Sequence, residues 1–227
     1  GNVMALLEIK NLAKTFHTPM GEIAASISIP SLQLEQGEAL LLDGPSGSGK
    51  TTLLHMISGL LSADSGSIYF AGEDVSKLPT AQRDVWRADN VGYIFQRLNL
   101  LDELNVLENI LLPQCWRKEK NKQTLRQRAL ALLEQVGLTQ KAACFPRELS
   151  IGEQQRVAVV RALVHKPKLL LADEPTASLD LENGKVVLGL LRQLCRENNV
   201  ALLLSTHDEA VKASFTHKYN VRGGCYE

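Results

Sequence analysis

A glycine-rich segment between two apolar runs is the feature that most constrains this chain. It follows residues 39–42, an apolar run that suits a strand, and precedes residues 52–57, whose spacing suits a helix. Glycines let a backbone turn its N–H groups toward phosphate oxygens, and the N-terminus of the next helix adds partial positive charge. The segment fits the pattern GxxxxGK[ST], and with one further residue it comprises Gly44, Pro45, Ser46, Gly47, Ser48, Gly49, Lys50, Thr51 and Thr52.

Two side chains of this segment carry its chemistry. Lys50 is expected to reach the terminal phosphates of a nucleotide, and the Thr51 hydroxyl is expected to bind Mg²⁺. A Gly/Ser turn that only joins a strand to a helix is the structural alternative. The context of the motif favours a nucleoside triphosphate site over that alternative.

Composition limits what else the chain can be. It has 227 residues, 44% of them hydrophobic, which is enough for one well-buried domain over residues 4–227. The 25 Lys and Arg residues balance the 25 Asp and Glu residues, so no nucleic-acid partner is expected. No apolar run approaches the roughly 18 residues of a spanning helix and no secretory signal is recognisable, so we expect a cytoplasmic chain. Residues 1–3, ahead of Met4, are expected to be a remnant of cloning.

Strand-like and helix-like segments alternate along the chain. Fully apolar strands alternating with helices indicate a parallel sheet covered on both faces, and an alternating pattern near the N-terminus indicates antiparallel strands. We therefore predict an α/β fold: a P-loop NTPase core with a mostly parallel sheet, an N-terminal antiparallel β subdomain, and a helical subdomain inserted at about residues 97–163. Strands are predicted at residues 22–34, 39–42, 67–70, 168–172 and 200–204, and helices at 52–57, 104–110, 122–136 and 182–196.

Acidic residues and a histidine follow the last two apolar strands. Asp173 and Glu174 come directly after one strand, at the carboxyl edge where α/β sheets bind ligands. Asp173 can hold Mg²⁺, and Glu174 can accept a proton from an attacking water. His207 follows the next strand and is placed to contact the γ-phosphate. The alternatives are that residues 173–175 begin a turn and cap the next helix, and that His207 is an ordinary polar residue at a strand end.

Several short motifs together resemble the nucleotide-binding subunits of ABC transporters. Residues 149–156, LSIGEQQR, are similar to the LSGGQ signature of that family, and residues 94–96, IFQ, resemble its Q-loop. Residues 178–180, SLD, resemble the D-loop, His207 the switch histidine, and Phe16 the aromatic residue that stacks on adenine. The match runs in the family's order over essentially the whole chain.

The resemblance implies an ABC ATPase fold and a role for each matched residue. Gln96 is then a catalytic residue that touches Mg²⁺ or the attacking water, beside Glu174 and His207. Phe16 stacks on the base, with burial among the N-terminal strands as the alternative. The signature residues act in trans on the ATP of a second copy, as does the D-loop: Ser150, Gly152, Glu153 and Asp180.

The resemblance also implies partners. One chain carries two anion-binding surfaces that cannot reach the same ATP, so two copies are expected to sandwich ATP head to tail. Residues 44–60 and 96–101 are similar to the lipoprotein-releasing and macrolide-exporter branch of the family, whose members drive a separate membrane permease. We therefore expect an ATP- and Mg²⁺-dependent motor that sits on the inner face of the membrane through that permease.

Two signature positions depart from the family pattern. Ile151 replaces the first glycine of the signature pair, and a β-branched side chain does not tolerate a positive φ, so the loop must use an Ile-compatible backbone or close less tightly. Glu153 replaces a glutamine, as in one branch of the family. The rival functions are a soluble ABC ATPase of DNA repair, chromosome structure or translation, and an unrelated P-loop kinase or GTPase. The sequence contains neither the coiled-coil insert, zinc hook or tandem domains of the soluble ABC ATPases nor the guanine-reading motif of GTPases.

Overall fold

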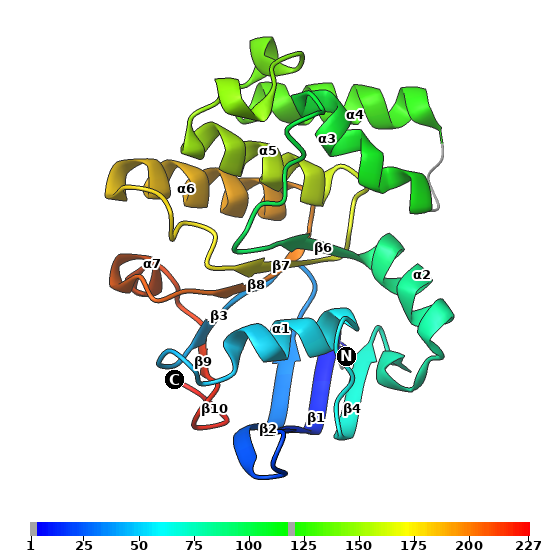
Figure 1. Cartoon of the computed structure of the whole chain (residues 1–227), viewed down its shortest axis with the longest axis vertical. Coiled ribbons are helices and arrows are strands. Elements are labelled where there is room, and N and C mark those ends of the chain that lie inside the picture. Colours follow the sequence, from blue (N-terminus) through cyan, green and yellow to red (C-terminus); the bar gives the residue numbers. More distant parts are fainter. Residues whose placement is uncertain (1–3, 118–120) are drawn as a thin grey trace.

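Two sheets build the core of this chain in a computed structural model that describes residues 4–117 and 121–227 (Figure 1). Among these residues the first sheet is four-stranded and antiparallel, in the order β2-β1-β4-β5, and the second is six-stranded, in the order β10-β9-β3-β8-β7-β6. The expected cloning remnant, residues 1–3, lies outside the described residues. The strands are β1 Leu7–His17, β2 Ile23–Leu34, β3 Ala39–Asp43, β4 Ser65–Phe70, β5 Glu73–Asp74, β6 Val91–Ile94, β7 Leu169–Asp173, β8 Ala201–Ser205, β9 Lys218–Asn220 and β10 Cys225–Tyr226.

Helices cover both faces of the second sheet, with α1 on the face toward the antiparallel sheet and α5 and α6 on the other (Figure 1). Strands β9, β3, β8, β7 and β6 pair in parallel, as the apolar runs predict. The described α-helices are α1 Lys50–Ser58, α2 Thr80–Asn90, α3 Val106–Leu111, α4 Lys122–Gln135, α5 Ile151–Leu163, α6 Leu181–Glu197 and α7 Glu209–Ala213. Short 3-10 turns are η1 Val75–Lys77, η2 Leu112–Trp116, η3 Thr139–Lys141 and η4 Pro146–Glu148.

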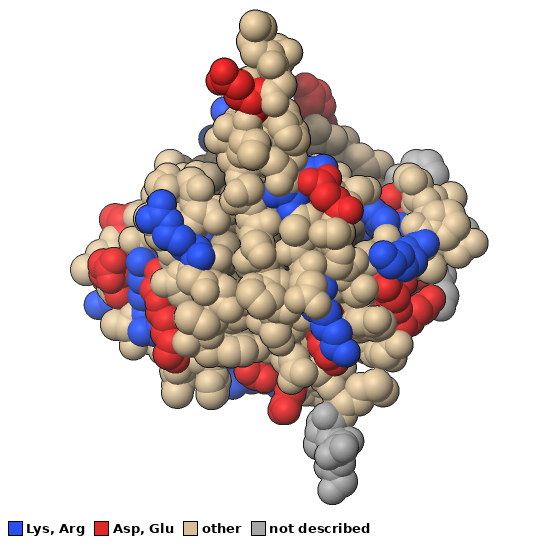
Figure 2. Space-filling view, turned by 90° about the horizontal axis from the view of Figure 1, so that it is seen from below, with Lys and Arg blue, Asp and Glu red and all other residues tan. Residues whose placement is uncertain are grey.

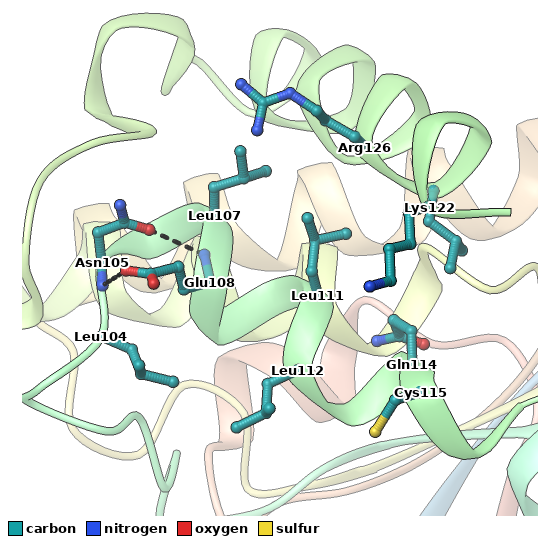
Figure 3. Close-up of a pocket in the computed structure, with 11 residues that line it drawn as sticks. Leu104, Asn105, Leu107, Glu108, Leu111, Leu112, Gln114, Cys115, Lys122 and Arg126 are labelled. Atoms are coloured by element: carbon teal, nitrogen blue, oxygen red, sulfur yellow. Dashed lines mark hydrogen bonds between the residues drawn. The ribbon is translucent and has the colours of Figure 1, made fainter. Parts of the chain in front are cut away.

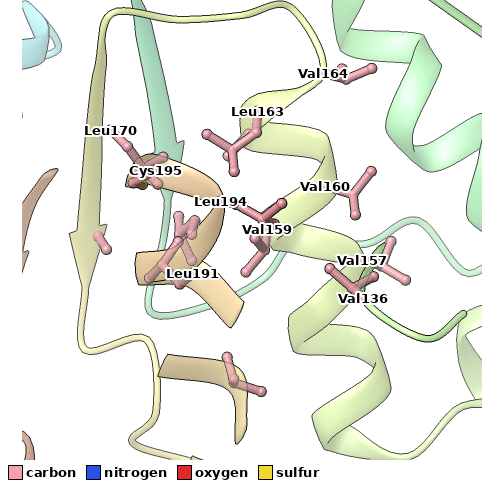
Figure 4. Close-up of a cluster of buried hydrophobic side chains, with 14 of the residues drawn as sticks. Val136, Val157, Val159, Val160, Leu163, Val164, Leu170, Leu191, Leu194 and Cys195 are labelled. Atoms are coloured by element: carbon pink, nitrogen blue, oxygen red, sulfur yellow. The ribbon is translucent and has the colours of Figure 1, made fainter. Parts of the chain in front are cut away.

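The apolar strands β3, β7 and β8 send alternate side chains into two different hydrophobic clusters. Leu41 and Leu170 join the cluster under α5 and α6, part of which is drawn in Figure 4. Leu42 and Leu171 join the cluster between α1 and the antiparallel sheet. Because both faces are covered, every residue of β7 and β8 is buried, which explains why these strands carry no polar alternation.

Helices α3 and α4, which follow β6, form a lobe that packs on α5. Side chains of α3 and α4, such as Ile110 and Leu133, belong to the same cluster as Val157 and Val160 of α5, so the lobe and the sheet share one core. The boundary drawn from the sequence, about residues 97–163, therefore remains a prediction. The predicted helix at residues 104–110 begins two residues later, because Asn105 caps it by accepting a hydrogen bond from Glu108 N at 2.8 Å.

The surface carries charges of both signs. Figure 2 shows Lys and Arg side chains interspersed with Asp and Glu side chains on the face formed by the antiparallel sheet end of the molecule, without a broad field of one sign. The balanced charge of the sequence is thus also mixed on this face. Within the described residues, no helix combines the length and apolarity needed to cross a bilayer.

Gly92 gives a test of how closely the signature helix α5 packs on the sheet. A Cβ placed at Gly92 would lie 2.3 Å from the Ala162 carbonyl oxygen. Gly92→Ala is expected to lower the free energy of unfolding by about 1–3 kcal/mol, because backbone must move. Gly189→Ala is the control, since its Cβ meets nothing within 4 Å and it lies in helix α6. Urea unfolding that shows the Gly92 variant as stable as the Gly189 variant would contradict this packing.

Candidate nucleotide site

The glycine-rich loop joins β3 to α1 through backbone conformations that only glycine adopts easily. Gly44 has φ 143° and Gly49, the N-cap of α1, has φ 101°. A Cβ at Gly44 would lie 2.6 Å from Ser48 Oγ, and a Cβ at Gly49 would lie 2.8 Å from the Ile27 side chain. The loop therefore curls tightly in front of the α1 N-terminus, where free N–H groups point outward. Pro45, Ser46 and Gly47 at its tip are exposed.

Lys50 turns its amine back over this loop. The side chain is buried at 6% exposure, donates a hydrogen bond to the Gly44 carbonyl, and places Nζ 3.3 Å from His207 Nδ1. Burial lowers the pKa of Lys50, and the Glu174 carboxylate partly offsets that effect. The loop thus holds a cation at its centre, next to the histidine predicted to contact a γ-phosphate.

Asp173 and Thr51, the two oxygen donors predicted for a metal, lie together. Thr51 Oγ1 donates to Asp173 Oδ2 at 2.9 Å, and Ser205 Oγ donates to Asp173 Oδ1 at 2.8 Å. The parallel register of β7 and β8 sets this geometry, because it pairs Asp173 with Ser205 at the carboxyl ends of both strands. The Asp173 carboxylate is only 5% exposed and is aimed at the first turn of α1.

Glu174 occupies a strained turn directly after β7. Its φ is 49°, a left-handed conformation that costs a residue with a side chain about 1–3 kcal/mol and that gathers at functional sites. Its N–H donates to Ser205 O at 3.0 Å, which holds the turn against β8. Helix α6 is capped by Asp180, so the alternative in which residues 173–175 cap the next helix is wrong.

His207 meets the Glu174 carboxylate twice. Its backbone N–H donates to Glu174 Oε2 at 3.1 Å, and its Nε2 lies 3.0 Å from Oε1. The Glu174 side chain is 9% exposed and the His207 side chain 52% exposed, so the pair sits at the mouth of the site. Lys50, Glu174 and His207, from three separate segments, thereby form one contiguous group of polar side chains.

The signature residues form an exposed helix N-terminus rather than part of this group. Ser150 caps α5 by accepting from Glu153 N at 3.1 Å, and Glu153 Oε1 accepts from Ser150 N at 2.9 Å. The helix starts at Ile151, directly after this cap. Ile151 is 54% exposed with an ordinary helical φ, so the backbone accommodates this departure from the glycine pair. Gly152 is buried against Asn183 of α6.

Three other predicted site residues lie at the edges of the site. Gln96 is exposed just beyond β6, the neighbour of β7. Phe16 is half-buried in β1 with the Lys14 amine 5.7 Å from its ring centre. Asp180 is the exposed N-cap of α6 and accepts from Asn183 N at 2.8 Å. In the described part of the chain, no hydrogen bond links these three to the group of Lys50, Glu174 and His207.

Sequence reasoning missed a second charged pair beside the loop. Asp43, the last residue of β3, accepts a hydrogen bond from Gly44 N at 2.7 Å and lies 2.9 Å from the Lys212 amine of α7. An acidic residue at the end of an otherwise apolar strand, directly before the glycine-rich loop, was the signal available in the sequence. Its partner could not be identified without the fold.

The comparisons with known proteins agree with one another. The model of the family described as ABC transporter matches residues 27–177. A protein of Rhodopirellula baltica named lipoprotein-releasing system ATP-binding protein LolD 2 is 39% identical, with 98% of this chain and 89% of that protein covered. The LolD protein of Shewanella denitrificans is 40% identical, with 96% of this chain and 93% of that protein covered.

Solved structures show the same arrangement. The ATP-binding cassette MJ0796, solved as a dimer in a post-hydrolysis state with ADP and Pi, superposes with a TM-score of 0.83 at 32% identity, covering 97% of this chain and 96% of that one. The cbiO1 protein of Clostridium perfringens, part of the transporter complex cbiONQ, also gives a TM-score of 0.83 but is 24% identical, which supports the fold alone.

Glu174 supplies the first functional test. Glu174→Gln keeps the shape and loses the base, so ATP binding is expected to persist while hydrolysis falls by about 10²–10⁴-fold. Phosphate release and equilibrium binding of ATP measure the two effects separately. Glu197→Gln, an exposed carboxylate at the last residue of α6, is the control and should hydrolyse at the wild-type rate. Near-normal turnover of the Glu174 variant would remove Glu174 from the catalytic role.

Proposed function

This chain belongs to the ABC transporter family, and we propose that it is the ATPase subunit that drives a separate membrane permease in lipoprotein release, export or mechanical transmission. The meeting of Lys50, Glu174 and His207 at one sheet edge carries the proposal, because it combines a phosphate-binding cation with a base and a polar contact. The names of the relatives favour the lipoprotein-releasing branch over a soluble ABC ATPase of DNA repair, chromosome structure or translation.

The residues present fit Mg²⁺. Thr51 Oγ1 and Asp173 Oδ2 are hard oxygen donors 2.9 Å apart at the first turn of α1, and Gln96 adds an amide at the end of the neighbouring strand. When bound, Mg²⁺ neutralises charge on the phosphates and polarises them. Ser205 orients the Asp173 carboxylate by donating to its other oxygen at 2.8 Å.

The remaining residues have separate roles in ATP binding and hydrolysis. Lys50 and N–H groups within residues 46–51 bind the phosphates, and Phe16 stacks on the base. Glu174 accepts the proton of the attacking water, and His207 holds that carboxylate from two directions while its other ring nitrogen faces Lys50. The strained turn at Glu174 fixes the carboxylate at the mouth of the site, where a water can approach it.

One chain provides only part of an ATP site. The N-termini of α5 and α6 lie together, since a Cβ at Gly152 would be 3.6 Å from Asn183 Oδ1. This surface, residues 150–153 and 180–183, exposes the apolar Ile151 and Leu181 together with helix N–H groups. A second copy related head to tail would place the surface over the phosphates of the first. The dimeric MJ0796 cassette supports this arrangement.

Association can be tested in the Glu174→Gln background, which retains ATP. With ATP and Mg²⁺ this variant is expected to shift from monomer toward dimer in sedimentation velocity. Adding Ser150→Arg should abolish the shift and leave monomeric ATP binding largely intact, because bulk and charge enter the partner's phosphate site. The same substitution at Ser31, exposed on β2, should leave dimerisation unchanged. An ATP-dependent dimer of the Ser150 double variant would refute the sandwich.

The helical lobe offers a surface for the permease. Several apolar residues follow Gln96 in this lobe. Leu100 packs half-buried against the core and Val106 and Leu107 are buried, whereas Leu101 is 47% exposed. The buried Asn109 holds this loop by accepting from Leu101 N at 2.7 Å and donating to Leu104 O at 3.0 Å. Leu101 is thus presented by a fixed loop.

Next to this loop lies an apolar groove of about 730 Å³ between α3 and α4 (Figure 3). Lys122 and Arg126, exposed one turn apart on α4, line its rim. A cytoplasmic helix of the permease with an apolar face and acidic residues would match both features. This contact would hold the subunit at the inner face of the membrane. The floor and walls include Leu104, Leu107, Leu111, Leu112 and Leu125.

Leu101 allows docking to be separated from catalysis. Leu101→Glu is expected to keep the basal ATPase of the isolated subunit and to lose stimulation by the reconstituted permease. Leu130→Glu, 38% exposed on α4 and outside the groove, is the matched control and should remain stimulated. Loss of solubility or of basal activity in the Leu101 variant would assign this leucine to the lobe's core instead.

A further inference from the structure

A charge pair ties the short helix α7 to the end of β3. The Lys212 amine lies 2.9 Å from Asp43 Oδ1, and the same carboxylate oxygen accepts the Gly44 N–H, the first N–H of the glycine-rich loop, at 2.7 Å. The two side chains are only 17% and 20% exposed. A half-buried, charge-assisted contact of this kind is stronger than an exposed ion pair. It therefore connects α7 directly to the start of the glycine-rich loop, the proposed phosphate loop.

The electrostatics of the pair agree with its geometry. Burial alone would raise the pKa of Asp43, but interactions with Lys212, Gly44 N and the Glu227 side chain lower it overall. The Asp43 carboxylate raises the pKa of Lys212, with a smaller contribution from Glu209 at 3.2 Å. Both groups are therefore charged at neutral pH. Their charges also reach Lys50, whose pKa Lys212 lowers and Asp43 raises.

Helix α7 in turn determines where His207 stands. Asp208 caps α7 by accepting from Ala210 N at 2.9 Å, and Lys212 N donates back to Asp208 O at 3.0 Å. His207 is the residue just before this cap and lies between it and the buried end of β8. Helix α7 is only five residues long, and Val211 is its one buried residue. Packing of Val211 therefore holds only one face of the helix against the core. The Lys212 contact fixes the end that faces the loop.

We propose that Asp43 and Lys212 are positioning residues that hold His207 against Lys50 and Glu174, so that the phosphate loop and the histidine segment move as one unit. The inference rests on the proposed ATPase site and adds a residue pair that acts through His207. If Lys212 is neutralised, α7 loses its tether and an unpaired carboxylate is left at the root of the phosphate loop. If Asp43 is neutralised, the tether is lost but a cation remains.

The two substitutions are therefore expected to differ in their effects on KM and kcat. Lys212→Met and Asp43→Asn should each lower kcat, by about tenfold or more, because small displacements of a catalytic group are costly. Only Lys212→Met should also raise the KM for ATP, since the bare Asp43 carboxylate repels phosphates. Lys212→Arg keeps the charge and should retain most of the kcat. Lys185→Met, an exposed lysine of α6, should behave as wild type.

Combination with His207→Ala shows whether the pair acts through the histidine. In that background Lys212→Met should lower kcat by less than about twofold, because no imidazole remains to be positioned. If Lys212→Met lowers kcat equally in the wild-type and His207→Ala backgrounds, the inference is overturned. It is also overturned if Lys212→Met keeps the wild-type kcat while His207→Ala lowers kcat. A wild-type kcat for His207→Ala would instead refute the role proposed for His207 in the ATPase site, on which the inference rests. Urea unfolding shows whether each variant is folded. If Asp43→Asn does not fold, the comparison of Lys212→Met with Lys212→Arg decides the outcome.

Discussion

The parallel pairing of β3, β8 and β7 is the constraint on which the site depends. Because these strands run in the same direction, their carboxyl ends meet at one edge, and each strand is followed there by a polar segment. The glycine-rich loop follows β3, Glu174 follows β7 and His207 nearly follows β8. The strands are held in place because every residue of β7 and β8 is buried, with α5 and α6 on one face and α1 and the antiparallel sheet on the other. A rigid apolar sheet thus brings together an amine, a carboxylate and an imidazole that lie far apart in the sequence.

The same architecture leaves the site open on one side. The phosphate loop and the carboxylates lie at the sheet edge, whereas the capped N-termini of α5 and α6 form a separate surface with exposed Ile151 and Leu181. In the proposed arrangement, one chain would contact the phosphates without enclosing them. Enclosure by a second copy would couple hydrolysis to the approach and separation of two subunits. The lobe that carries the signature helix shares its core with the sheet, so such a movement would also carry the groove between α3 and α4.

The sequence predicted those parts of the fold in which pattern and environment agree. The apolar runs of β7 and β8 indicated covered parallel strands, and they also located Asp173, Glu174 and His207 at strand ends. The limits of β1 were not predicted, because Asn11 at φ 49° and a register shift between Lys10 and Ala13 interrupt its alternation. Helix α2 was missed because it buries none of its residues. The pairing of Asp43 with Lys212 depends on the position of α7, which no local pattern specifies.

The catalytic unit that we propose is two chains closed on ATP, each supplying what the other lacks. The most direct test is the specific ATPase activity of the isolated wild-type protein over a wide dilution series. We expect specific activity to fall on dilution and to depend cooperatively on ATP, because two nucleotide-loaded chains must meet. Specific activity that stays constant on dilution, with a hyperbolic dependence on ATP and a protein that remains monomeric throughout, would contradict it.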